Sequence, residues 1–376
     1  MSMNKVLLVG VGDIGKQVLN FLVRDPKCPE LLVGDFNEEF GRKRVNAAIS
    51  NATVMGMYPK VRFEKFDLAD VDRTAEQIAE FRPDVVINGT VMQTWHVIRA
   101  LPTEIYQQLS RATLGAWTPC QVALAYKLMQ AIKKSGVKTR VVNTAFSCET
   151  NPMLASVDLP ADIGIGNVEL LLPGCRMLAA EKLGVPISMV QIYLVVHHLW
   201  WVYRREFGYQ EGPFWMKIMV NDKDVTSQFD TKKLLSDSDE LYNPGPDFTV
   251  FSASSAIKNM YALMDPVGIF THSPGPQGLP GGYPVFISQR GAEVCLPEGI
   301  TLQEAIEINE KSQYFDGIAK IEKGGTVHYS DFTAKILKDM LGFDKPTWKV
   351  QESYEVAKEL MSKYRAFATK HGVKFD

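Results

Sequence analysis

The feature that most constrains the fold is the stretch KVLLVGVGDIGKQV at residues 5–18, an apolar run that enters a glycine-rich turn. Gly10, Gly12 and Gly15 have the G-x-G-x-x-G spacing that binds a dinucleotide when it lies between a strand and a helix. The first glycine permits a tight turn, the second lets the backbone approach a pyrophosphate, and the third lets helix and strand pack closely. We therefore expect a strand, then a helix whose N-terminal N–H groups face the phosphates.

An acidic residue ends the next apolar run. ELLVGD at residues 30–35 predicts a second strand ending at Asp35, whose carboxylate would accept hydrogen bonds from ribose hydroxyls and repel a 2′-phosphate. This favours NAD over NADP; the alternative is a similar domain that binds no nucleotide. The predicted cofactor contacts are Gly10, Gly12, Asp13, Ile14, Gly15, Asp35, Phe36, Asn37, Asp67, Leu68, Asn88, Gly89, Thr90 and Asn143.

Apolar runs alternate with helical patterns through the first 150 residues, which predicts an α/β fold with a doubly wound parallel sheet. From about residue 156 the pattern is mixed, and residues 274–284 are so rich in Gly and Pro that we expect a loop. Pro173 should kink or divide the helix predicted around it. We expect an NAD-binding Rossmann domain over residues 1–155, an α+β substrate or catalytic domain over 156–345, and a C-terminal helix over 346–376.

The composition excludes several classes of function. Lys plus Arg is 41 and Asp plus Glu is 43, so the net charge of −2 offers no general field for nucleic acid or an anionic membrane. The five cysteines are odd in number and without CxxC spacing, which disfavours a disulfide framework or a structural zinc site. No apolar run reaches the length of a membrane span, and no secretory leader precedes the first strand. A cytoplasmic location is the default expectation.

Two of the six histidines are adjacent, in YLVVHHLWW at residues 193–201. In a regular strand, His197 and His198 would point to opposite faces, so we expect His197 to be turned away from any site that His198 lines. A metal site that uses both, with Cys148 or Cys175, is disfavoured for the same reason. A histidine packed in the core is the alternative to a catalytic one.

Two longer stretches resemble the NAD-dependent lactate/malate dehydrogenase superfamily. GIGNVELLLPGCRMLAAEKLGVPISMVQIYLVVHH at 164–198 is similar to the segment that ends at the family's catalytic histidine. GGYPVFISQRGAEVCLPEGITLQEAIEINEKSQ at 281–313 is similar to its C-terminal hairpin and helix. The first domain also resembles saccharopine-dehydrogenase-type Rossmann domains. The resemblance implies a lactate/malate-dehydrogenase-like α+β C-terminal domain, hydride transfer to or from NAD, a small-molecule substrate and a homo-oligomer.

The resemblance also implies roles for individual residues. His198 falls at the catalytic acid–base, His197 at the residue before it, and Asn143 at the asparagine beside the nicotinamide and the substrate oxygen. Glu169 is the acid nearest to the position that pairs with the histidine in the family. The Thr301–Glu304 capping box fits the start of the C-terminal helix.

Departures from the family concern the substrate. The closely spaced arginines that clamp a substrate carboxylate are missing from their usual places, and bulky residues follow His198. The substrate is therefore expected to be hydroxy-acid-like or larger and more apolar. Its candidate contacts are His96, Arg99, Arg176, Trp200 and Trp201. Three alternatives stay open: an imine-reducing dehydrogenase, an enzyme that retains NAD and uses transient oxidation for elimination or hydrolysis, and a non-catalytic dinucleotide sensor.

Overall fold

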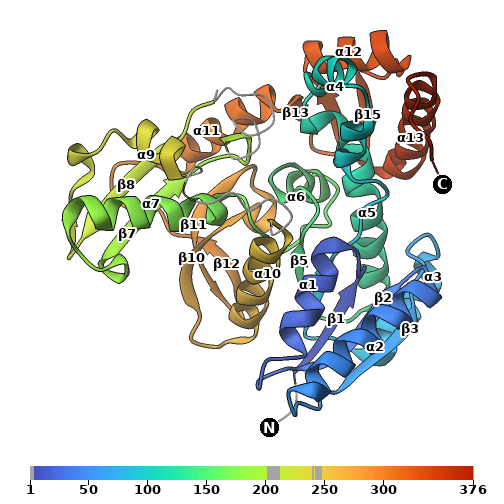
Figure 1. Cartoon of the computed structure of the whole chain (residues 1–376), viewed down its shortest axis with the longest axis horizontal. Helices are drawn as coiled ribbons and strands as arrows, with labels where there is room; N and C mark the ends of the chain where they lie inside the picture. Colours follow the sequence, from blue (N-terminus) through green and yellow to red (C-terminus); the bar gives the residue numbers. More distant parts are fainter. Residues whose placement is uncertain (1–3, 201–211, 239–240, 242–247, 376) are drawn as a thin grey trace.

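The computed structural model describes residues 4–200, 212–238, 241 and 248–375 (Figure 1). A six-stranded sheet in the order β3-β2-β1-β4-β5-β6 dominates the N-terminal half, and all of its pairings are parallel. Its strands are β1 (Lys5–Val9), β2 (Glu30–Asp35), β3 (Val61–Lys65), β4 (Val85–Asn88), β5 (Arg140–Asn143) and β6 (Ile163–Gly164). The predicted doubly wound parallel sheet is confirmed.

The helices of this half lie between the strands. They are α1 (Asp13–Leu22), α2 (Glu38–Val54), α3 (Val71–Phe81), α4 (Thr103–Ser110), α5 (Thr118–Ser135) and α6 (Ser147–Ala155), with 3₁₀ turns η1 (Trp95–Ala100) and η2 (Leu114–Trp117). The glycine turn joins β1 to α1 as predicted. Gly10 has φ +88°, and a Cβ on Gly15 would lie 2.0 Å from the Gly10 carbonyl oxygen, so neither position tolerates a side chain without movement.

The described part of the chain after β6 forms three antiparallel sheets, β7-β8-β9 and β10-β11-β12 in the second half and β13-β14-β15 in the C-terminal segment. The strands of the second half are β7 (Val190–Val195), β8 (Trp215–Val220), β9 (Lys223–Asp224), β10 (Ile269–Pro274), β11 (Gly282–Ser288) and β12 (Gly291–Val294). Its helices and 3₁₀ turns are α7 (Val168–Leu183), η3 (Ile187–Met189), η4 (Thr226–Gln228), α9 (Thr231–Ser238), α10 (Phe248–Met264), η6 (Pro276–Gly278) and α11 (Leu302–Phe315). The expected α+β pattern is confirmed.

Two local predictions in this half need correction. Helix α7 runs unbroken through Pro173, which lies within the first two turns of the helix. The stretch 274–284 is only partly a loop, because Pro274 ends β10 and Gly282 begins β11, which pair with each other. The capping box at Thr301 is present as predicted.

The C-terminal segment returns to the Rossmann half (Figure 1). It consists of β13 (Ile318–Ile321), β14 (Thr326–Tyr329), α12 (Asp331–Leu341), β15 (Thr347–Lys349), η7 (Val350–Glu352) and α13 (Ser353–Lys370). Its apolar side chains belong to the same buried cluster as those of α5. The Tyr364 hydroxyl donates to the Val97 carbonyl over 2.6 Å, and its ring meets Trp117 edge-on. The domain boundaries at residues 155 and 345 stay predictions.

None of the described helices has both the length and the apolar character required to cross a bilayer.

Candidate active site

The glycine turn and the end of β2 form a cradle at the carboxyl edge of the sheet. The Asp35 carboxylate accepts hydrogen bonds from the backbone N–H groups of Val11 and Asn37, each over 3.0 Å. Arg44 donates to the carbonyl oxygens of Val11 and Gly12 over 2.8 and 3.1 Å, which holds the turn from its other side. A Cβ on Gly12 would meet nothing within 4 Å, so the space that a pyrophosphate needs beside the helix N-terminus is open. These residues fit a dinucleotide.

The other predicted cofactor contacts lie along the same edge, because each follows one of the parallel strands β1 to β5. Phe36 is 72% exposed beside Asp35, whereas Leu68 is buried after β3. Asn88 ends β4 and accepts hydrogen bonds from the hydroxyl and the N–H group of Thr90. Their contacts with a cofactor stay predictions.

Asn143 connects this edge to helix α6. Its amide oxygen accepts from the Asn88 side chain and from the Ala145 N–H group, and its amide nitrogen donates to the side chains of Thr150 and Asn151. These are four hydrogen bonds, the full capacity of an asparagine side chain. Asn143 therefore fixes the start of α6, and a contact with nicotinamide would have to replace one of these bonds.

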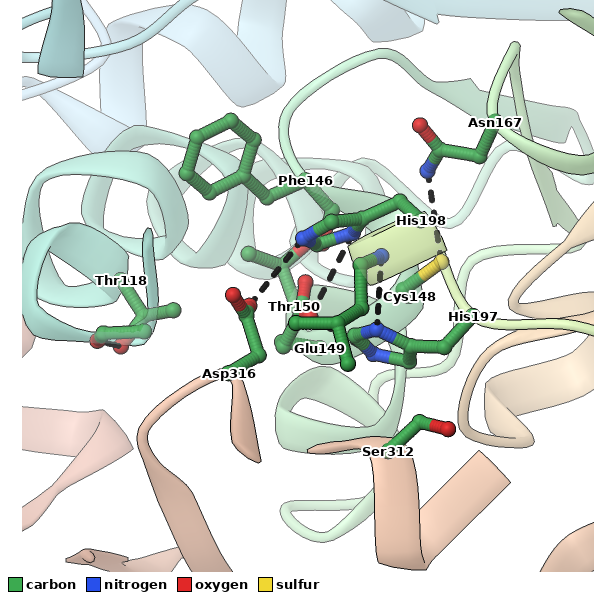
Figure 2. Close-up of polar contacts among 12 residues, drawn as sticks. Thr118, Phe146, Cys148, Glu149, Thr150, Asn167, His197, His198, Ser312 and Asp316 are labelled. Carbon is green, nitrogen blue, oxygen red and sulfur yellow. Dashed lines mark hydrogen bonds and ion pairs between the residues drawn. The ribbon is translucent and has the colours of Figure 1, made fainter. Parts of the chain in front are cut away.

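Four side chains converge beyond α6 (Figure 2). His198 Nε2 lies 3.1 Å from Asp316 Oδ2, and His198 Nδ1 lies 3.5 Å from Glu149 Oε1. His197 Nε2 lies 2.8 Å from the same Glu149 oxygen, and the two imidazole centroids are 4.5 Å apart. All four side chains are at most 2% exposed. The cluster is built by the first helical turn of α6, the chain just past β7, and the end of α11.

The expectation that His197 is turned away from the site of His198 is wrong. Strand β7 ends at Val195, and Val196 keeps only an isolated bridge to Gly282. Because the chain bends into a turn at these histidines, the alternation of a regular strand no longer applies to them. Both rings therefore reach the Glu149 carboxylate.

The pairing of Glu169 with His198 is also wrong. The Glu169 carboxylate accepts from the hydroxyls of Ser255 and Thr271 and contacts the Lys258 ammonium, on α10 and β10. The acids that face His198 are Glu149 and Asp316.

Burial and charge act on the four groups in different directions. Burial raises the pKa of Glu149 well above its usual range and lowers the pKa of His197 well below it. Burial alone would lower the pKa of His198, but the acids Glu149 and Asp316 outweigh it and raise that pKa to about 9. Asp316 also lies within hydrogen-bond distance of the His198 ring, and this hydrogen bond favours the charged imidazole.

No family model matches the chain, and no curated protein matches its sequence. Solved structures do match it. The minor L-lactate dehydrogenase from Enterococcus mundtii superposes with a TM-score of 0.54 at 14% identity, over 83% of this chain and 96% of that one. Malate dehydrogenase from Plasmodium falciparum superposes with a TM-score of 0.54 at 14% identity, over 84% of this chain and 97% of that one. Lactate dehydrogenase from Eimeria maxima, solved with NADH and oxamate, superposes with a TM-score of 0.52 at 15% identity, over 100% of this chain and 98% of that one.

The chain has the lactate/malate dehydrogenase fold. The likeness extends over both halves, which agrees with the resemblance found in the sequence.

Within this fold, the predicted substrate contacts lie in several places. His96 and Arg99 are on η1, and both pack on Trp95. The centroids of the His96 and Trp95 rings are 4.2 Å apart, and the Arg99 guanidinium carbon lies 5.0 Å from the Trp95 ring centroid. Arg176 is half-buried on α7, and burial lowers the pKa of its guanidinium. Their substrate roles stay predictions, and Trp201 lies outside the described residues.

Trp200 is a core residue. It is 2% exposed, its indole N–H donates to the Gly212 carbonyl over 3.1 Å, and its ring packs against Phe214 at 4.9 Å. Leu199 is buried as well. Leu199 and Trp200 therefore fill the interior, and the expectation that Trp200 stacks on a substrate is not supported.

Glu149 and Asp316 were missed as site residues. Glu149 carried one usable signal, since it follows β5 at the carboxyl edge where ligands gather in doubly wound folds. Asp316 carried none, because it comes together with His198 only through the fold, across 118 residues of sequence.

Proposed function

We propose that the protein is an NAD-dependent oxidoreductase that transfers a hydride between nicotinamide and a secondary alcohol or ketone. The observation that carries this proposal is that helix α6 links two parts of the site: it holds Asn143 at the carboxyl edge of the sheet, and its Glu149 lies beside the His198–Asp316 pair. The fold supports it, because the Eimeria maxima lactate dehydrogenase was solved with NADH and oxamate.

The cofactor is proposed to be NAD rather than NADP. Asp35 places a carboxylate where the adenosine ribose would lie, and a 2′-phosphate there would be repelled. Arg44 does not offset this charge, because its guanidinium is engaged by the Val11 and Gly12 carbonyls and lies over the Phe40 ring.

His198 is proposed to exchange the proton that accompanies hydride transfer. When bound, nicotinamide accepts or supplies the hydride; the imidazole takes the hydroxyl proton of the alcohol or returns it to the ketone. Asp316 would orient the ring and stabilise its charged form. The substrate is proposed to be a small hydroxy or oxo compound, and the buried Trp200 gives no reason to favour an aromatic one.

The test combines binding and turnover. Titration with NADH and NADPH should give tighter binding of NADH, and a panel of secondary alcohols, 2-oxo acids and amine-plus-oxo-acid pairs should reveal turnover by NADH absorbance. His198→Gln should lower kcat by roughly 10²- to 10⁴-fold with NADH affinity unchanged. His328→Gln, a matched change at a half-exposed histidine on β14, serves as the control.

Each result bears on a different part of the proposal. Absence of dinucleotide binding would refute the function as a whole, and full activity of His198→Gln would refute the proton role alone. Reaction only with amine-plus-oxo-acid pairs would indicate imine reduction, and turnover without net change in NADH would indicate a retained cofactor.

A further inference from the structure

We propose that Glu149, His197, His198 and Asp316 form a binding site for one divalent transition-metal ion. The inference deepens the proposed function, on which it rests only for the idea that the cluster is the reacting site. Metal binding itself is argued from the donor atoms.

The geometry suits a single ion (Figure 2). One nitrogen or oxygen from each of the four side chains lies within 4.8 Å of all the others. The three close pairs are separated by 2.8, 3.1 and 3.5 Å. Two ligands of a tetrahedral ion with bonds of about 2.0–2.1 Å are themselves roughly 3.3 Å apart. His198 offers an ion only one of its two ring nitrogens, Nδ1 on the side of Glu149 or Nε2 on the side of Asp316, so modest side-chain shifts would bring the four donors to this spacing.

Several of these atoms lack partners. Both Glu149 oxygens, His197 Nε2 and Asp316 Oδ1 are buried, and no described residue gives them a hydrogen bond of acceptable geometry. His197 Nε2 and Glu149 Oε1 are 2.8 Å apart but not aligned as donor and acceptor. Buried polar atoms in native proteins nearly always have partners. Buried donor atoms that converge without aligned hydrogen bonds are an arrangement that a cation completes.

The charge is also suited to a divalent ion. Once His198 gives up its proton, two carboxylates with two neutral imidazoles carry −2, which a divalent cation neutralises, whereas a water molecule brings no charge. Within the part of the chain that the structure describes, the ion pairs of Glu149 and Asp316 are with the two histidines only, without any Lys or Arg. Buried carboxylates need such compensation.

The donor types select the metal. Imidazole with carboxylate suits zinc and its first-row neighbours better than magnesium or calcium. Cys148 Sγ, which accepts a hydrogen bond from the Asn167 amide, forms an alternative donor group with both histidines. A sulfur beside the site shifts the preference further towards Zn²⁺.

The ring nitrogen of His198 that coordinates a metal ion cannot also carry a proton. Metal binding must therefore release protons. When bound, a cation held by these four residues would supply Lewis-acid chemistry to a substrate oxygen.

The experiment uses the full chain, freed of metal by a chelator and then titrated with Zn²⁺ by calorimetry. We expect one ion per chain, and the visible spectrum of the Co²⁺-loaded protein should show tetrahedral coordination. His197→Gln and Asp316→Asn should each weaken binding by more than about 100-fold, beyond the 10- to 100-fold typical of outer partners. His328→Gln should bind as the unchanged protein does.

Two results would overturn the site: no stoichiometric ion, or wild-type affinity in both ligand variants. If the variants do not fold, imidazole ¹⁵N shifts of His197 and His198 in the Zn²⁺-loaded wild type decide, since both must move. NADH binding is measured in the same samples. Cofactor binding without metal would refute this inference alone, and metal binding without cofactor would refute the proposed function alone.

Discussion

His198 Nε2 lies 3.1 Å from Asp316 Oδ2, although 118 residues separate them in the chain. Asp316 is fixed by its own backbone, because its carbonyl oxygen accepts from the Thr113 hydroxyl and the Gly115 N–H group over 2.5 and 2.8 Å. The pair therefore joins the loop after β7 to the connection between α4 and α5. Its geometry depends on the folded chain as a whole.

Two glycines of the turn should separate folding from cofactor binding. Gly12→Ala should change the free energy of unfolding by no more than about 1 kcal/mol, because the added Cβ meets nothing within 4 Å. It should weaken NADH binding at least about tenfold, since the methyl occupies the pyrophosphate position. Gly15→Ala should instead destabilise the protein by about 1–3 kcal/mol or more, because its Cβ would lie 2.0 Å from the Gly10 oxygen. Urea unfolding measures the stability of each variant, and NADH titration measures its cofactor affinity. If Gly12→Ala and Gly15→Ala changed both quantities equally, the separation of folding from cofactor binding would be contradicted.

Asp35 should determine cofactor choice. Asp35→Ala removes charge-assisted hydrogen bonds worth about 1.5–3 kcal/mol, so NADH should bind roughly 10- to 100-fold more weakly. The affinity for NADPH should fall less than that for NADH, because the repulsion between the carboxylate and the 2′-phosphate disappears. Asp35→Asn is the near-isosteric comparison: it removes the charge and retains an acceptor for only one of the two N–H groups of Val11 and Asn37. Dissociation constants for both cofactors give the answer, and unaltered NADH affinity in Asp35→Ala would remove Asp35 from the ribose site.

The metal-free protein should lose stability as pH rises from about 6.5 to 9. The folded pKa of His198 is raised to about 9, so its contribution is complete below the unfolded value of 6.5 and lost towards 9. This is at most about 3 kcal/mol. The raised pKa of Glu149 acts in the same direction, because the buried acid must ionise, whereas the lowered pKa of His197 costs stability only below about 6.5.

Urea unfolding in chelator at several pH values measures this loss, and His198→Gln should flatten it. Added Zn²⁺ should stabilise more at high pH, because its ligands must be deprotonated. A metal-free stability that is level across this range would contradict the charge assignment.

Thiol labelling should distinguish two classes of cysteine. Cys28 and Cys295 are partly exposed, whereas Cys120, Cys148 and Cys175 are fully buried. Burial raises the pKa of each of the three buried thiols to about 12, which also suppresses the reactive thiolate. A disulfide reagent should therefore modify two thiols in the folded protein and five in denaturant. The double change Cys28→Ser with Cys295→Ser should abolish the rapidly labelled thiols. Rapid labelling of this variant would mean that a buried cysteine becomes accessible to solvent.

Much of the fold could be predicted from sequence because its signals are local. The glycine spacing after an apolar run fixes the β1–α1 turn within a few residues. The Thr301 capping box and the last helix, Ser353–Lys370, likewise depend on neighbouring residues. Helix α7 shows the limit, since it stays continuous through Pro173, which lies within its first two turns.

The candidate site was predicted less well because its partners are distant in sequence. His198 and Glu169 were both assigned by the resemblance to the dehydrogenase superfamily, but Glu169 faces Lys258 instead. The position of His197 was wrong because strand alternation was extended two residues beyond Val195. No local pattern indicates that Asp316 reaches the same place.

The backbone and the side chain of Asp316 make separate contacts. Its carbonyl oxygen anchors the turn after α4, and only its side chain faces His198. Exchange of the side chain leaves that anchor in place, so position 316 can be varied chemically while the backbone that presents it stays where it is. An engineer could tune the acidity or the ion preference of the centre here with little disturbance of the scaffold.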